Sequence, residues 1–298
     1  MQELFRPDRP PRDEAGLRCR RFLESAWRGF RLTRLLWPRE LTERLVPVLA
    51  WQRVVRSTER TGVPPGAAEA LQELVAELER NEPRSALAVA LVPVLRELDA
   101  STMGLRGTIA ELEKTKQSSA FASRAELVRH ARRLDGPATR WLTRVVGLEG
   151  ERAELQADAL ALGVRLASWL AELPTDLRAG RLRIAAEDLL EERLDALSFP
   201  DALDDPKDLR VQALLRRHIR WARTELAKGW PVCEELGAWR GRQLAFALRW
   251  NAATLSAVEA AGLSVPASGV RSGWLRVLAC GAASAFGTGA PFGSYSPA

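Results

Sequence analysis

Apolar residues recur along most of this chain at intervals of three and four positions, and this spacing restricts its fold more than any other feature. Residues spaced in this way fall on one face of an α-helix, whereas a strand with one buried face needs strict alternation of apolar and polar residues. Alternating stretches are scarce in the sequence. The pattern therefore predicts an all-α protein.

Proline, glycine and short polar clusters divide the helical pattern into segments. Pro137 is expected to begin a helix with Asp135 as its N-cap, and Pro174 is expected to end another. The stretch "SFPDALDDP" at 198–206 is expected to be a loop. The expected helices span residues 17–36, 40–60, 67–80, 84–98, 101–117, 123–133, 135–147, 154–173, 185–197, 207–229, 235–261 and 267–284.

No clear linker divides these segments into halves, so we expect one helical domain over residues 15–286. Residues 1–14 are charged and rich in proline, and residues 287–298 are rich in glycine. Both terminal segments are therefore expected to be flexible.

The composition is that of a globular protein, with 46% hydrophobic and 28% charged residues. The net charge of +6 is spread along the chain, and no nucleic acid partner is expected. No segment approaches the roughly 18 apolar residues of a membrane-spanning helix, and the N-terminus lacks the apolar core of a secretory signal. We expect a cytoplasmic protein, with peripheral contact with a membrane left open.

Residues with the spacing of common cofactor sites are scarce. Cys19, Cys233 and Cys280 lie far apart, which argues against a disulfide framework. His130 and His218 each lack a second histidine or cysteine at metal-binding spacing. No cofactor is therefore expected from these residues.

The segment "DDPKD" at 204–208 has DDxxD spacing, and carboxylates on one helical turn can hold magnesium and a diphosphate. Pro206 interrupts the segment just before an expected helix. Asp204, Asp205 and Asp208 are therefore interpreted as a capping and first-turn acidic cluster.

A cationic stripe ends the second expected helix. In "LAWQRVVRSTER", residues 49–60, the arginines Arg53, Arg56 and Arg60 are spaced i, i+3 and i+7 and so share one helix face. Arginines can bind phosphate through bidentate hydrogen bonds, or they can pair with carboxylates elsewhere in the fold. The stripe is compatible with a ligand site and with internal ion pairs.

The segment "LGVRLASWLAELPTDLRAGRLRIAAEDL" at 162–189 resembles the squalene/phytoene synthase family. Its Glu172 and Asp176 match the two acidic positions of the family's DxxxD motif, and Gly180 and Arg181 match its Gly-Arg pair. Further matches follow in the family's order at residues 25–55, 107–112, 126–147, 187–189 and 235–262, so that the resemblance covers residues 20–285.

The resemblance implies a single-domain, isoprenoid-synthase-type helical bundle around a central cavity. Active members carry two aspartate-rich motifs, whose magnesium ions grip the diphosphates of two allylic substrates. In this chain Arg56 and Ser57 stand at the paired acidic positions of the first motif and Arg60 at the last. Glu111 stands where a further element of the family has aspartate.

The second motif and the positions around the implied cavity also differ from the family pattern. Glu172 replaces the first aspartate of the DxxxD motif, and Pro174 falls inside the motif. Arg165 stands where the family has glutamine, and His130 and Arg132 replace residues of its "YCY" element. The resemblance therefore covers the fold more fully than the chemistry.

Two functions are compatible with this resemblance. In the first, the protein has lost prenyl transfer and binds an isoprenoid, another lipid or a protein partner, as degenerate family members do, one of them implicated in assembly of respiratory complex I. In the second, it is a divergent magnesium-dependent prenyltransferase or terpene synthase acting on farnesyl or geranylgeranyl diphosphate. The candidate diphosphate-binding residues are Arg53, Arg56, Arg60, Arg181 and Glu111.

We expect the first function, a pseudoenzyme, and assign no catalytic residue. Glu172 and Asp176 are the candidates for a degenerate metal site, and magnesium is expected only if the protein is active. We expect the stripe arginines to pair with these carboxylates, or with Glu111, instead of holding a diphosphate.

Overall fold

The computed structural model describes residues 1–27, 30–31, 38–61, 66–117, 120–205, 207–261, 279–280, 282–284 and 291. In these residues no strand occurs, and one isolated bridge joins Phe121 to Ala185. The all-α prediction is therefore confirmed. The helices are α1 (Gln2–Phe5), α2 (Arg12–Ala26), α4 (Arg39–Thr61), α5 (Ala67–Arg80), α6 (Ala86–Glu97), α7 (Met103–Gln117), α8 (Arg124–Val145), α9 (Glu151–Arg178), α10 (Ala186–Glu191), α11 (Phe199–Asp204), α12 (Leu209–Gly229), α13 (Pro231–Glu235) and α14 (Gly237–Ala261).

The helices form two compact units. The first contains Met1–Gln117 and Arg133–Glu154, and the second contains Ser118–Arg132 and Leu155–Ala298. Helix α8 therefore contributes its first part to the second unit and its remainder to the first.

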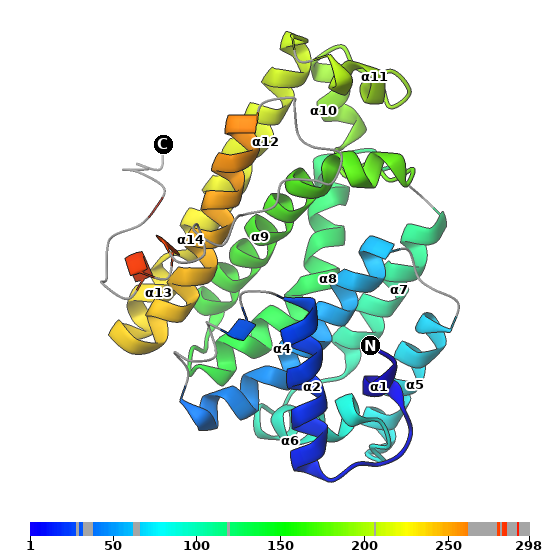
Figure 1. Cartoon of the computed structure of the whole chain (residues 1–298), viewed down its shortest axis with the longest axis vertical. Coiled ribbons are helices and arrows are strands. Elements are labelled where there is room, and N and C mark those ends of the chain that lie inside the picture. The colour runs from blue at the N-terminus through cyan, green and yellow to red at the C-terminus, as the bar shows by residue number, and fades with distance from the viewer. Residues whose placement is uncertain are drawn as a thin grey trace. The chain divides into compact units, whose positions relative to one another are not determined.

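The core of the first unit forms where α2 packs against α4 and α6, and α5 packs against α6 and α7 (Figure 1). Trp51 of α4 is completely buried there, together with leucines from the surrounding helices. Burial of such large apolar side chains is the main contribution to the stability of a helical unit of this kind. The helix of the cationic stripe is thus a core helix of the first unit.

In the second unit, the long helices α12 and α14 run side by side and α13 joins them (Figure 1). Helix α9 also approaches α12 closely, because two glycines lie at their contact. A Cβ on Gly163 would lie 2.7 Å from the backbone nitrogen of Leu226, and a Cβ on Gly229 would lie 3.0 Å from Cβ of Leu160. Neither position has room for a side chain, so glycine sets the spacing of these helices.

The predicted break at Pro137 is wrong, because residues 124–145 form the single helix α8. Proline has no N–H, so the carbonyl of Arg133, four residues earlier, lacks its helical donor. The hydroxyl of Thr108 on α7 donates to that carbonyl at 2.8 Å. A Cβ on Gly104 would lie 3.0 Å from the Pro137 ring, so α7 can come close enough to supply this bond. Asp135 is consequently a residue of the helix interior and not an N-cap.

Two further predictions near prolines are corrected. Pro174 lies inside α9, which continues to Arg178 because buried side chains on both sides of the proline, including Leu173 and Asp176, hold the last turns in place. The expected loop at 198–206 contains the short helix α11, in which Pro200 occupies the first turn, where proline is tolerated.

The ends of the chain differ from the prediction where they are described. Helix α2 begins at Arg12, within the segment expected to be flexible, and Leu4 of α1 is buried. Within the first expected helix, α2 ends at Ala26, because Trp27 has an extended backbone, with φ −138° and ψ 101°. Residues 30–31 are again helical, and residues 28–29 and 32–36 lie outside the described part of the chain. Most of the expected helix at 267–284 and of the tail at 287–298 lies outside the described residues.

Candidate functional site

The three arginines of the stripe have different environments on α4. The Nε of Arg56 lies 3.3 Å from Oδ1 of Asp135, whose side chain is completely buried, whereas that of Arg56 is 23% exposed. Arg53 donates from Nη2 to the carbonyl of Ala26, the last residue of α2, and so satisfies a helix end that would otherwise lack a donor. Arg60 is exposed. The stripe therefore serves at least two structural purposes within the first unit.

Glu111 is paired within the first unit as well. Its Oε2 lies 3.0 Å from Nη1 of Arg133, and the Glu111 side chain is 11% exposed. This carboxylate occupies the position where the resemblance implies an aspartate. The guanidinium of Arg133 therefore neutralises much of the negative charge with which the Glu111 carboxylate would attract a metal ion.

In the second unit, the Gly-Arg pair closes back onto the acidic motif. Asp176 is buried near the end of α9, and its Oδ1 accepts from Nη2 of Arg181 at 2.6 Å and from Nε at 3.0 Å. Gly180 has φ +70°, a left-handed conformation that favours glycine. The backbone N–H of Arg181 donates to the carbonyl of Asp176 at 2.8 Å. The helix terminus itself thus aims the guanidinium at the carboxylate.

Glu172, the first residue of the acidic motif, lies one turn before Asp176 on α9 and is partly buried. It belongs to the second unit, whereas Arg53, Arg56 and Arg60 belong to the first. Pairing between the stripe and the acidic motif therefore stays a prediction.

A buried stack of rings and cations surrounds Trp169 on α9. The ring of His130 stacks on that of Trp169 with centroids 6.0 Å apart, and Phe121 lies 4.9 Å from His130. The guanidinium carbons of Arg165 and Arg183 lie 5.8 and 5.9 Å from the centroid of Trp169. Both arginines are less than 5% exposed. At these distances they interact with the π-face of the indole in a water-poor environment.

A second ion-pair network centres on Asp188, in the expected helix start at 187–189. Its side chain is completely buried, Arg124 binds it directly, and Nε2 of His218 lies 3.2 Å from its Oδ2. Burial works to raise the pKa of Asp188, but interaction with His218 and Arg124 outweighs burial and lowers it. Arg217, 3.9 Å away, adds positive charge. This network could not be predicted from the sequence, because its members lie up to 94 positions apart and share no local motif.

The interpretation of "DDPKD" as a capping cluster is confirmed at Asp208. Its carboxylate accepts from the backbone N–H groups of Arg210 and Val211 at the start of α12. The guanidinium of Arg210 and these backbone groups lower the pKa of Asp208 to about 2. Asp205 accepts from the N–H of Lys207 at 2.9 Å, as a turn residue does.

The donor set at the two motif positions does not fit a magnesium cluster. Magnesium needs near-octahedral oxygen ligands and is held through carboxylates. The resemblance assigns Arg56, Ser57 and Arg60 to the first motif, and the carboxylate of Asp176, which it assigns to the second, already binds Arg181. Across the part of the chain that the structure describes, no group of three histidine, cysteine, aspartate or glutamate residues is placed to hold a metal ion.

A membrane-spanning helix must be about 20 residues long and predominantly apolar. Within the described residues, no helix is both long enough and apolar enough to cross a bilayer.

Known proteins of one family are similar to this chain in sequence or structure. The family model described as squalene/phytoene synthase matches residues 23–276. The squalene synthase HpnC from Alicyclobacillus acidocaldarius has a similar structure, with a TM-score of 0.73 and 18% identity over 84% of this chain and 94% of that one. A dehydrosqualene synthase in complex with a ligand gives a TM-score of 0.81 and 13% identity over 92% of this chain and 97% of that one. No curated protein matches the sequence.

Proposed function

Because the chain belongs to the squalene/phytoene synthase family, we propose that it keeps the family's isoprenoid-synthase fold as a binding protein and has lost magnesium-dependent prenyl transfer. Its ligand is an isoprenoid or another lipid, and a protein partner is the other candidate. The family's fold depends on helix packing, whereas its chemistry depends on the carboxylates of the acidic motifs. A chain can therefore keep the fold and lose the chemistry through changes at these motifs alone.

The observation that carries the proposal is the cationic first motif, in which Arg56 pairs with the buried carboxylate of Asp135. At the second motif, Asp176 forms an ion pair with Arg181. Asp176 is the one aspartate that the second motif retains, and two nitrogens of Arg181 donate to the same oxygen of its carboxylate. A metal ion would have to compete with that guanidinium in a buried site, where breaking a charge pair is costly. With arginine at the first motif as well, two substrates could not both be ionised by bound magnesium.

The Trp169 stack supports the same proposal. The resemblance puts polar or tyrosine residues at the positions of Arg165 and His130, and in this chain both are buried against the Trp169 ring. Side chains held in a packed stack cannot rearrange freely around a reacting substrate. This part of the second unit is therefore suited to a fixed, packed role.

Purification of the full chain from its native cells tests the proposed function. The protein would be isolated without detergent, extracted with organic solvent, and its lipids identified by mass spectrometry. An isoprenoid or lipid in stoichiometric amount, or a stable protein partner, is expected. The matched control is the same chain carrying Arg80→Gln, an exposed change on α5 that should retain the ligand. A clean, ligand-free monomer from native extract would contradict the proposal.

One observation favours the alternative, a divergent prenyltransferase. The Arg56 side chain is 23% exposed despite its contact with Asp135, so part of the guanidinium could still bind a diphosphate oxygen. This alternative requires pyrophosphate release from farnesyl or geranylgeranyl diphosphate in the presence of magnesium, and lower release from the Arg56→Ala variant.

A further inference from the structure

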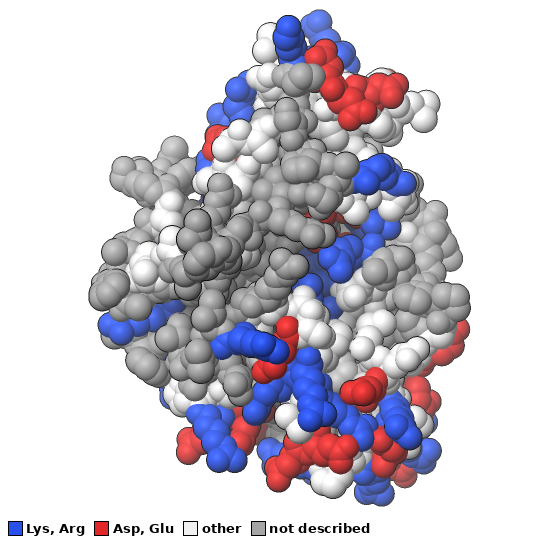
Figure 2. Space-filling view, in the orientation of Figure 1, with Lys and Arg blue, Asp and Glu red and all other residues white. Residues whose placement is uncertain are grey.

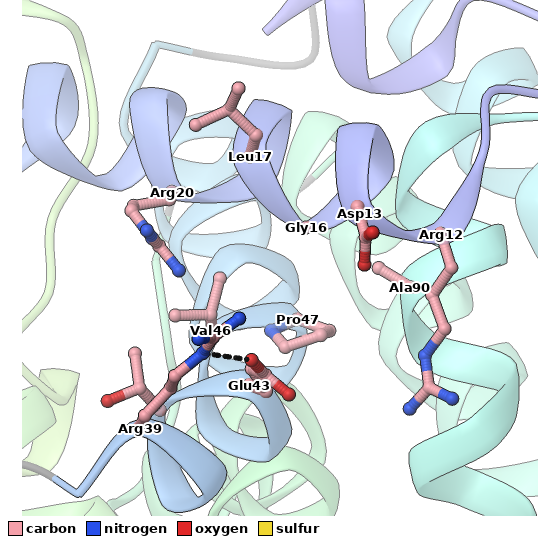
Figure 3. Close-up of a pocket in the computed structure, with 11 residues that line it drawn as sticks. Arg12, Asp13, Gly16, Leu17, Arg20, Arg39, Glu43, Val46, Pro47 and Ala90 are labelled. Carbon is pink, nitrogen blue, oxygen red and sulfur yellow. Dashed lines mark hydrogen bonds and ion pairs between the residues drawn. The ribbon is translucent and has the colours of Figure 1, made fainter.

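The first unit contains a groove that the proposed function does not use. It has a volume of about 700 Å³ and lies between one face of α2, the first half of α4, and α6 (Figure 3). On α4 the groove involves residues 39–47, whereas the cationic stripe begins at Arg53. The residues that line it are Arg12, Asp13, Gly16, Leu17, Arg20, Arg39, Thr42, Glu43, Val46, Pro47 and Ala90.

Cations outnumber carboxylates in this groove. Arg39 and Glu43 pair at 3.1 Å, but both side chains are exposed, so water screens this contact and a ligand could replace it at little cost. Among the described residues, no carboxylate lies within 4.0 Å of the guanidinium of Arg12 or Arg20. With Asp13 as the remaining acid, the groove has an excess of positive charge.

Arg20 is the most informative of these cations. Its side chain extends from α2 toward α4 (Figure 3), and the residue is partly buried. The Nε atom is buried and has no hydrogen-bond partner in the described structure. A buried donor without an acceptor is costly, and an oxyanion in the groove would satisfy it.

The groove also has an open, apolar section. A Cβ added at Gly16 would meet no atom within 4 Å, so α2 leaves space there. Val46 and Pro47 of α4 and Ala90 of α6 line the groove beside this space (Figure 3). On the face shown in Figure 2, arginines gather among acidic residues over the part of the first unit that contains α2 and α6. The groove thus combines cationic side chains with an adjacent apolar surface.

We propose that this groove binds an anionic amphiphile, with a phosphate or carboxylate oxyanion at Arg20, on the side of the groove that Arg39 lines, and an alkyl segment along Val46, Pro47 and Ala90. The oxyanion supplies the acceptor that Arg20 Nε lacks, and the alkyl segment fills the space beside Gly16. This site is separate from the positions on which the proposed function rests, because its residues on α4 precede the motif.

Calorimetric titration of the full chain with dodecyl phosphate, below its micelle-forming concentration, tests the proposal. Gly16→Leu puts a side chain into the groove, and Gly107→Leu, also at an open helical position but on α7, is the matched control. Arg20→Gln removes the cation that is proposed to bind the oxyanion. Arg80→Gln, which breaks an exposed pair with Glu73, controls for the loss of one positive charge. Inorganic phosphate, as a separate arm, distinguishes a free anion from an amphiphile.

We expect Gly16→Leu and Arg20→Gln each to weaken binding of dodecyl phosphate by about tenfold or more, with the two controls within about twofold of the wild type. Inorganic phosphate should bind more weakly than dodecyl phosphate. Three results would overturn the proposal: no binding at about 1 mM dodecyl phosphate, equal affinity of Gly16→Leu and the wild type, or equal affinity for inorganic phosphate and dodecyl phosphate. None of them bears on prenyl transfer, so failure here leaves the proposed function to its own test.

Discussion

Arg56 of α4 and Asp135 of α8 form an ion pair in which Nε lies 3.3 Å from Oδ1 and the aspartate side chain is completely buried. The sequence resemblance assigns Arg56 to a position at which the family has an acidic residue, which would reverse the sign of the charge there. Its neutralising carboxylate comes from a helix 79 positions along the chain. Arg56 is therefore part of the internal charge balance of the first unit.

Replacement of Arg56 by glutamine should destabilise the protein. The change removes a charged partner from buried Asp135, and we expect the free energy of unfolding to fall by about 1–3 kcal/mol. Urea unfolding of the full chain measures it. Arg80→Gln, which breaks an exposed ion pair, should change the same quantity by less than about 0.5 kcal/mol. Equal effects of the two variants would show that the Arg56 pair is not structural.

The bond from Thr108 to the carbonyl of Arg133 should be stabilising only because Pro137 is present. We expect Thr108→Val to lower the free energy of unfolding by about 1–2 kcal/mol, since it leaves the carbonyl of Arg133 without the donor that replaces the missing proline N–H. Pro137→Ala restores a backbone N–H four residues after Arg133. In that background Thr108→Val should cost clearly less, and a double-mutant cycle by urea unfolding would measure the coupling. Additive effects would contradict this account of α8.

Gly180 should be sensitive to substitution although nothing crowds it. Its φ of +70° disfavours any residue with a Cβ, so we expect Gly180→Ala to cost about 1–2 kcal/mol of stability. Gly107 is equally uncrowded but lies in regular helix α7, and Gly107→Ala should stabilise by up to about 1 kcal/mol. Thermal or urea unfolding of the two variants checks this, and changes of the same sign would contradict it.

Asp188 should make stability depend on acid pH. Its pKa is lowered in the folded state, so its contribution is complete above the unfolded value of about 4 and is lost as the pH falls through the folded value. The difference in unfolding free energy between wild type and Asp188→Asn should therefore shrink as the pH falls from about 5 toward 3. Urea unfolding over this range measures it. A difference that stays constant with pH would show that Asp188 does not titrate in this way.

The fold could be predicted from the sequence wherever the signal was local. The helix expected at 67–80 is α5, Ala67–Arg80, because its apolar periodicity and its flanking turn residues lie within the helix itself. The break at Pro137 was predicted wrongly because the donor that replaces the proline N–H is on another helix. A local rule about proline cannot include a hydroxyl from Thr108, 25 positions before the acceptor.

The candidate site could be predicted only in outline. The resemblance identified Asp176, Gly180 and Arg181 as a group, and the structure adds that glycine turns the arginine back onto the aspartate. The resemblance gave no indication that Asp135 pairs with Arg56. Asp135 precedes Gly-Pro in the sequence, and this pattern predicted an N-cap instead of an ion-pair partner. Charge partners that are far apart in sequence become apparent only when the helices are packed.

Release of pyrophosphate is the most direct test of the claim that this family member has lost prenyl transfer. The full chain would be incubated with magnesium and either farnesyl or geranylgeranyl diphosphate, beside a blank without protein and an active family member as positive control. We predict that wild type, Asp176→Asn and Arg56→Ala all give the pyrophosphate signal of the blank. Magnesium-dependent release by the wild type that Arg56→Ala or Asp176→Asn lowers would contradict the claim.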